Sequence, residues 1–238
     1  MKAVVLQSNY LPWKGYFDLI HEADVFIYYD EVKYTKNDWR NRNRIYSPNG
    51  LQWLTVPIPR NSTHLKISEV KITDPYWQKR HFKTLQGAYQ SAPFFSQLAP
   101  LLEAFYLERK WESLALLNRF AIEKISGLIG IETQVLDSAD FDLSGNRVDR
   151  LLDLLIQAGA NEYITGPAAK DYLEGKESLF AEKGIKLNYK DYSGYPAYRQ
   201  QRSPFVHEVS ILDMLANLKR EEIGHHIWGW REAVAQRS

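Results

Sequence analysis

Short apolar runs alternate with polar loops at the start of the chain. Residues 2–6 form one apolar run, and residues 25–29 form a second that is rich in β-branched and aromatic side chains. Between them, Phe17, Ile20 and Ala23 recur at near-helical spacing. A strand, a loop, a helix and a strand of these lengths predict a right-handed βαβ unit with two parallel strands.

Different patterns occupy the middle of the chain. The turn signal at 47–50 stands between two β-rich runs and predicts a β-hairpin after the second strand. Three segments with helical spacing follow, at about residues 75–89, 94–106 and 111–127. We expect them to form a helical sub-domain at about 75–130.

Strand and helix signals alternate again after Gly130. Strands are predicted at 134–136, 162–164 and 187–189. Helices are predicted at 147–157, from Gly166-Pro167 onward, and at 209–218. The whole pattern predicts one α/β domain over 1–238, with a Rossmann-like, mainly parallel sheet, flanking helices, the hairpin and the helical insertion.

Composition narrows the classes of protein. The 238 residues are 45% hydrophobic with a net charge of +1, so a substantial core is expected and disorder is not. The absence of cysteine excludes disulfides, thiolate catalysis and Cys-ligated zinc. Neither a signal-peptide core nor an apolar run of roughly 18 residues is present. We therefore expect a cytoplasmic protein without a membrane span, whose oligomeric state the sequence leaves open.

Positive charge is concentrated in residues 33–46, which hold five basic residues and one acid. If this stretch is extended, Arg40, Arg42 and Arg44 share one face, roughly 7 Å apart, and repel one another unless an anion lies across them. The neighbouring Tyr34 and Trp39 offer flat surfaces for a sugar or a base. This pattern favours a polyanion site, and the alternative is a solvated basic sheet edge.

Ligands of parallel α/β sheets bind beyond the carboxyl ends of the strands. That rule points to the polar residues after the first strand and to Asp30 with the basic stretch after the second. The residues after the first strand are Gln7, Asn9, Tyr10 and Trp13.

A second anion site is predicted where Gly166 opens a helix that contains Lys170. A Gly-Pro pair is also common at the start of a helix that binds no anion. In that alternative Lys170 lies in solvent with its stem over Tyr172.

Two histidines are candidates for acid–base chemistry. His81 has Lys83 beside it on an aromatic helix, and His207 precedes Ser210 and Asp213. Either is equally compatible with a structural role, and the nucleophile elbow of a hydrolase is absent. Ser210 is then simply a helix cap. No metal-binding spacing occurs, so no metal site is expected.

Several segments together resemble the WbqC-like protein family. They are QSNYLPWKGYF (7–17), YTKNDWRNRN (34–43), HFK (81–83) with Tyr89, GPAAKDYL (166–173) and FVHEVSILD (205–213). Ser8 replaces a proline of the usual family opening. The resemblance implies a bacterial protein associated with the synthesis of surface polysaccharide (O-antigen).

The candidate residues and the resemblance together support one functional hypothesis, which has one rival. The hypothesis is a cytoplasmic enzyme, a transferase or an ATP-dependent ligase, that transfers an acyl or aminoacyl group to a nucleotide-linked amino sugar or a similar phosphate-bearing molecule. The rival is a non-catalytic module that binds a sugar nucleotide or a partner. The near-neutral net charge argues against nucleic acid. The cofactor stays open, with ATP or a sugar nucleotide as the candidates.

The candidate residues fall into two groups. Those expected to act in catalysis are His81, His207 and Asp213. Those expected to bind substrate are Gln7, Asn9, Tyr10, Trp13, Asp30, Tyr34, Lys36, Trp39, Arg40, Asn41, Arg42, Lys83, Tyr89, Gly166, Lys170, Tyr172 and Ser210.

Overall fold

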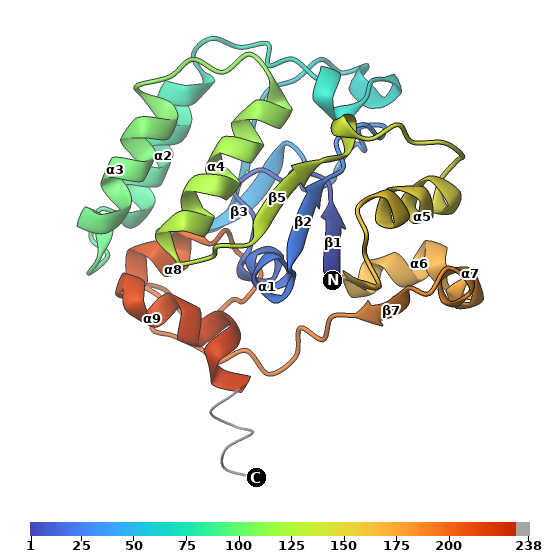
Figure 1. Ribbon diagram of the computed structural model, residues 1–238. Helices are drawn as coiled ribbons and strands as arrows, with labels where there is room; N and C mark the ends of the chain where they lie inside the picture. Colours follow the sequence, from blue (N-terminus) through green and yellow to red (C-terminus); the bar gives the residue numbers. More distant parts are fainter. Residues whose placement is uncertain (232–238) are drawn as a thin grey trace.

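A five-stranded parallel sheet forms the centre of the computed structural model, which describes residues 1–231 (Figure 1). Its strands stand in the order β5-β2-β1-β6-β7. Their bounds are β1 (Lys2–Leu6), β2 (Val25–Tyr28), β5 (Gln134–Asp137), β6 (Glu162–Thr165) and β7 (Lys186–Tyr189). The register pairs Ala3 with Val25 and Leu6 with Tyr28. All four residues of β2 are buried, as expected for a strand that is covered on both faces.

Helices cover the two faces of this sheet. Val4 and Phe26 point into the larger core cluster, which includes side chains of α1 (Lys14–Glu22), α2 (Trp77–Tyr89), α3 (Phe95–Tyr106), α4 (Leu114–Leu128) and α8 (Leu212–Asn217). Val5 and Ile27 point into the second cluster, with α5 (Val148–Gln157), α6 (Lys170–Leu173) and α7 (Glu177–Glu182). The predicted α/β class with flanking helices is confirmed.

The strand order places a topological switch between β1 and β6. The chain moves outward from β1 to β2 and β5, and then returns to β6 and β7 on the other side of β1. Ligands of such sheets bind at the carboxyl ends of the strands beside the switch. Gln7 follows β1 there, and Gly166 follows β6. The strand predicted at 162–164 belongs to the same parallel sheet as the first strand and pairs directly with it.

The predicted hairpin is also present. Its strands β3 (Arg42–Ser47) and β4 (Gly50–Thr55) pair antiparallel, with Arg44 opposite Trp53. Gly50 has a φ of 95° in the turn, a conformation that costs glycine little. The hairpin packs against α2 and α8, on the same face of the sheet as α1.

Two predicted helices are shorter than expected. The helix predicted at 209–218 begins only at Leu212, because Ser210 forms an isolated β-bridge with Trp13 and its N–H group donates to the carbonyl of Arg44 (2.8 Å). The segment after Gly166 consists of a 3₁₀ turn and a four-residue α-helix. The remaining helical turns are η1 (Ser62–His64), η2 (Ile67–Glu69), η3 (Ser138–Asp140), η4 (Pro167–Ala169), α9 (Arg220–Gly224) and the π-helix η5 (His225–Gly229).

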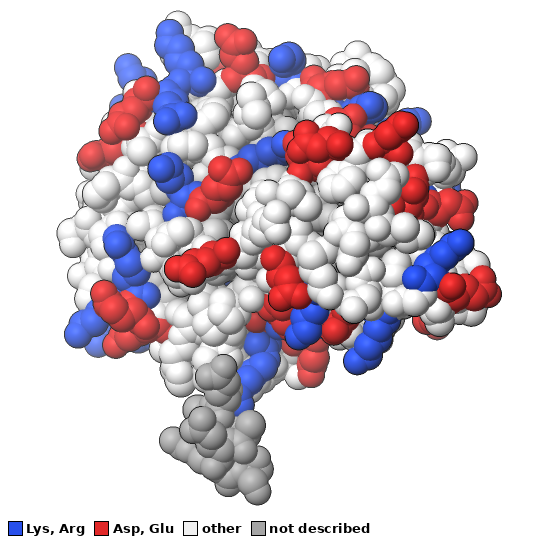
Figure 2. Space-filling model, in the orientation of Figure 1, with Lys and Arg blue, Asp and Glu red and all other residues white. Residues whose placement is uncertain are grey.

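Charged side chains of both signs are interspersed over the face shown in Figure 2. This distribution agrees with the net charge of +1. Among residues 1–231, no helix is both long enough and apolar enough to cross a membrane.

Candidate functional site

Arg40 lies at the carboxyl end of β1, beside two residues predicted from the sequence. Its guanidinium donates to Oε1 of Gln7 (2.8 Å) and to Oδ1 of Asn9. Asn118 of α4 holds this arrangement, because its amide donates to the backbone carbonyls of Arg40 (2.8 Å) and Ser8 (3.3 Å). Gln7, Asn9 and Arg40 therefore come together as the topology of the sheet suggests.

A row of alternating cations and rings extends from Arg40 along the hairpin. The guanidinium of Arg42 lies 4.4 Å from the ring centre of Trp53, and that of Arg44 lies 6.0 Å from Trp39 and 5.9 Å from Trp53. We call these five residues, Arg40, Arg42, Arg44, Trp39 and Trp53, the arginine–tryptophan strip. The two indoles are 5.5 Å apart, and 40% and 45% exposed. They are in direct contact, so they present one exposed aromatic platform.

Trp53 is absent from the residues selected by sequence. The signal that identifies it is the hairpin register, which places Trp53 opposite Arg44. Cross-strand pairs on one face of a sheet lie within contact distance.

The strip has unused hydrogen-bonding capacity. The Nε–H groups of Arg40, Arg42 and Arg44 are buried and have no hydrogen-bond partner within residues 1–231. An unsatisfied buried donor costs about 1–3 kcal/mol, and more when the group is charged. Two carboxylates offset the charge, Asp38 at 3.4 Å from Arg40 and Glu208 at 3.9 Å from Arg44. Burial raises the pKa of Asp38, but Arg40 and the Thr35 hydroxyl outweigh it and hold this pKa below its usual value.

Two pockets adjoin the strip. The first has a volume of about 190 Å³ and includes Tyr34, Lys36, Asn41, Arg42 and Arg60 in its lining. The second has a volume of about 230 Å³ and is lined by Asn9, Pro12, Trp13, Trp39, Asn43 and Glu208. Each is smaller than a typical site for a drug-sized ligand, so each suits one group of a larger molecule that lies along the strip.

His207 lies close to the second pocket and has an unexpected partner. Its Nδ1 is 2.9 Å from Nζ of Lys14, the first residue of α1. Lys14 is 2% exposed, and burial lowers its pKa from 10.5 to about 8 against the opposing effect of Glu208. Lys14 is not among the residues predicted from the sequence. A lysine at the start of an apolar helix, inside the segment 7–17, was the available signal.

Asp213 and Ser210 do not join His207 in a triad. The buried Asp213 carboxylate accepts from the Tyr198 hydroxyl (2.6 Å) and from Nε2 of Gln200 (2.9 Å). Burial raises the pKa of Asp213, although these donors lower it. Ser210 is buried, and its backbone pairs with Trp13 in an isolated β-bridge.

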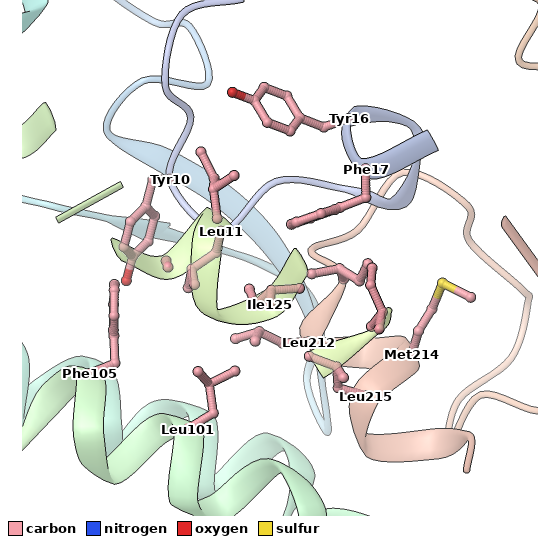
Figure 3. Packing of buried hydrophobic residues seen from close by; sticks show 14 of the residues in the cluster. Tyr10, Leu11, Tyr16, Phe17, Leu101, Phe105, Ile125, Leu212, Met214 and Leu215 are labelled. Carbon is pink, nitrogen blue, oxygen red and sulfur yellow. The ribbon is translucent and has the colours of Figure 1, made fainter. Parts of the chain in front are cut away.

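His81 and Tyr10 lie together inside the core. Nδ1 of His81 is 2.8 Å from the hydroxyl of Tyr10, which also contacts the Tyr106 hydroxyl. Figure 3 shows the Tyr10 side chain directed toward Phe105 of α3. Burial lowers the pKa of His81 from 6.5 to about 4. Neither residue lines the two pockets described above.

The other predicted residues have separate surroundings. Asp30 is buried, accepts from the Ser8 backbone N–H (2.8 Å) and pairs with Arg119 (2.8 Å). Asn41, which borders the first pocket, is bonded to the Tyr34 hydroxyl (2.7 Å) and to the Val56 carbonyl (2.9 Å). Outside both pockets lie the buried Tyr89, the exposed Lys83 and Tyr172, Gly166 beside Tyr192, and Lys170, whose Nζ is 5.3 Å from the ring centre of Tyr189.

Known proteins are similar to this chain over most of its length. The model of the WbqC-like protein family matches residues 7–225. The chain is also 43% identical over 221 residues to the uncharacterized protein Rv1507c of Mycobacterium tuberculosis, and the match covers 92% of this chain and 95% of that protein. No solved structure matches. The chain belongs to the WbqC-like protein family.

Proposed function

We propose that this member of the WbqC-like protein family is an enzyme that binds a nucleotide-linked amino sugar on the arginine–tryptophan strip. It transfers an acyl or aminoacyl group to the sugar in the synthesis of a surface-polysaccharide precursor. The observation that carries the proposal is the set of three buried arginine Nε–H groups without partners, beside an exposed pair of indoles.

The chemistry of the strip suits a diphosphate joined to a flat base. Arginine binds phosphate oxygens through two parallel N–H groups, and such charge-assisted bonds are stronger than neutral ones. A nucleobase stacks on the exposed indole platform. The amide side chain of Asn9 lines the second pocket, and its Nδ2 group can donate to a hydroxyl of a sugar ring.

The transfer needs an activated carboxylic acid as its second substrate. The sugar amine attacks the carbonyl carbon, and a C–N bond forms as the bond between that carbon and its leaving group breaks. The amine loses one proton to a base, and the leaving group departs with the electron pair.

Binding to the strip is tested with nucleotide sugars and an Arg42→Ala variant. A ligand at 100 times its dissociation constant adds about 2.7 kcal/mol to the free energy of unfolding, which a thermal-shift screen detects. We expect Arg42→Ala to weaken binding, measured by calorimetry, with a nearly unchanged melting temperature. Lys183→Ala is the control, because Lys183 is an exposed cation just beyond α7 on the other face of the sheet.

Three outcomes decide between the hypotheses. Binding together with acyl transfer supports the enzyme. Binding without transfer from any activated acid supports the non-catalytic module. No thermal shift with any nucleotide compound, or a large loss of stability in Arg42→Ala with unchanged binding, contradicts the role of the strip.

A further inference from the structure

Lys14 is a buried cation whose surroundings are aromatic. Its Nζ lies 4.7 Å from the ring centre of Tyr195, 5.9 Å from Tyr198 and 5.8 Å from Phe205. Within residues 1–231, no carboxylate oxygen lies within 4 Å of Nζ, although most buried lysines are paired. The hydrogen bond to Nδ1 of His207 is its directional contact with another side chain.

That hydrogen bond determines where the proton of His207 lies. An ammonium group has three donors and no acceptor, so Nδ1 must accept. A neutral imidazole that accepts at Nδ1 carries its single proton on Nε2. Burial and the neighbouring Lys14 charge both lower the pKa of His207, while Glu208 opposes them. The ring is thus neutral at pH 7, where Lys14 still holds its proton.

The charged and titratable groups around this pair leave the assignment unchanged. Glu208 is the carboxylate that acts on both residues, and it is turned toward Arg44 at 3.9 Å. The hydroxyl of Tyr195 contacts Asp18, which Lys190 and Arg231 also bind. The hydroxyl of Tyr198 donates to Asp213. Both tyrosine hydroxyls therefore point to carboxylates, and only their rings face the ammonium.

The pair is adjacent in sequence to two residues that line the second pocket. Trp13 and Glu208, the sequence neighbours of Lys14 and His207, both line that pocket. Glu208 also connects it to the arginine–tryptophan strip through Arg44. A sugar nucleotide held on the strip would thus bring its sugar toward His207.

We propose that Lys14 is a positioning residue that holds His207 as a neutral imidazole with its proton on Nε2, so that His207 donates a hydrogen bond to the acyl carbonyl oxygen. The carbonyl role rests on the proposed function, whereas the tautomer does not. As the sugar nitrogen bonds to the carbonyl carbon, the C=O electron pair moves to oxygen, and the Nε2–H group stabilises this oxyanion. The carbonyl re-forms when the bond to the leaving group breaks.

The test is nitrogen-15 NMR of the imidazole rings, read through the carbon-bound ring protons at pH 7. His207→Gln assigns the resonance. We expect Nε2–H in the wild-type protein and a mixture of tautomers in Lys14→Met, with the pKa of His207 moving back toward its ordinary value. Methionine keeps the apolar stem among the rings. The exposed His64 gives the control resonance in both proteins.

Each result decides part of the proposal. A proton on Nδ1 in the wild-type protein overturns it, and this measurement needs no variant to fold. Identical titration of His207 with and without Lys14 also overturns it.

The carbonyl contact is tested by adding a nucleotide-linked N-acetylated amino sugar, the product-like probe. It should shift the His207 Nε2 resonance. Binding heat without such a shift refutes the carbonyl contact alone. A complete lack of binding refutes the proposed function and this contact, while the tautomer stands on its own measurement.

Discussion

Two buried nitrogen bases illustrate how individual residues divide between core and site. Burial lowers the pKa of both His81 and Lys14. His81 bonds to Tyr10 among the aromatic rings of α2 and α3, and no pocket adjoins it. Lys14 bonds to His207, which is only partly buried, whereas Tyr10 is fully buried. Partners and access, more than burial, separate a structural residue from a functional one.

The pKa of His81 makes stability depend on pH. The His81 ring takes up a proton near pH 6.5 in the unfolded chain but only near pH 4 in the folded chain. The stability that the neutral, buried ring contributes is therefore fully present above pH 6.5 and is lost as the pH falls toward 4. We expect the free energy of unfolding, measured in urea, to fall by about 2 kcal/mol more between pH 7 and pH 5 in the wild-type protein than in His81→Gln. His64→Gln is the control. Equal pH slopes in wild type and His81→Gln would show that the folded protein accommodates the charged ring.

Some of the candidate functional side chains can be predicted from the residue types in the sequence alone. Clustered arginines and aromatic residues indicated the strip, because charge and flat rings leave a signal in a short stretch of sequence. Lys14 with His207 leaves no such signal, since 193 positions separate them along the chain. Whether a histidine faces the core or a pocket likewise depends on helix packing far away in sequence, as His81 shows.

At the scale of elements, the hairpin organises the loop that carries Asn9. Asn43 of β3 donates to the backbone carbonyls of Tyr10 (3.2 Å) and Leu11 (2.8 Å). Leu11 has a φ of 45°, in the left-handed region that costs a non-glycine residue roughly 1–2 kcal/mol. The hairpin thereby stabilises a strained turn that places Asn9 beside Arg40.

Removing this support should be costly. Asn43→Leu keeps the approximate volume but leaves both carbonyls without their donor, and we expect a loss of about 2–3 kcal/mol in the free energy of unfolding. Urea denaturation measures it. Asn49→Ala, at the exposed turn of the same hairpin, should change stability by less than about 0.5 kcal/mol. A comparably small loss of stability in Asn43→Leu would show that the turn keeps its conformation without these two hydrogen bonds.

Local patterns predicted most elements and failed where tertiary contacts replace local ones. The first βαβ unit, the hairpin and the helices of the middle region follow from periodicity and turn residues. The helix expected from residue 209 begins later, because Ser210 forms a β-bridge with Trp13 and donates its N–H group to the carbonyl of Arg44. A periodic pattern carries no information about such distant acceptors.

At the scale of the whole molecule, Asp18 ties the last part of the chain to α1. This buried carboxylate accepts from Lys190 after β7 (2.9 Å) and from Arg231 (2.8 Å), and it contacts the Tyr195 hydroxyl. Tyr195 is one of the rings around Lys14. Lys14 lies on α1, one turn before Asp18. Asp18 therefore links the packing of Lys190 and Arg231 to the surroundings of Lys14.

Neutralising this carboxylate should destabilise the protein. Asp18→Asn removes the charge of a buried carboxylate that both Lys190 and Arg231 bind, and breaking a buried ion pair costs about 3–5 kcal/mol. Differential scanning calorimetry should show a clear drop in melting temperature. Glu22→Gln is the matched control, because Glu22 binds the same Lys190 from a more exposed position and surface pairs contribute at most about 1 kcal/mol. Similar melting temperatures for the two variants would show that the ion pairs of Asp18 do not stabilise the protein more than a surface pair does.

The strand order also governs when the sheet is completed during synthesis. β1 and β2 emerge within the first thirty residues, but β2 pairs with β5, which begins at Gln134, and β1 pairs with β6, which begins at Glu162. Pairings this distant slow folding, because the chain must close long loops before it gains their contacts. Both outer edges of the early pair stay open in the meantime, and open edges promote aggregation. A nascent chain stalled before residue 162 thus exposes one edge of β1, the central strand of the finished sheet.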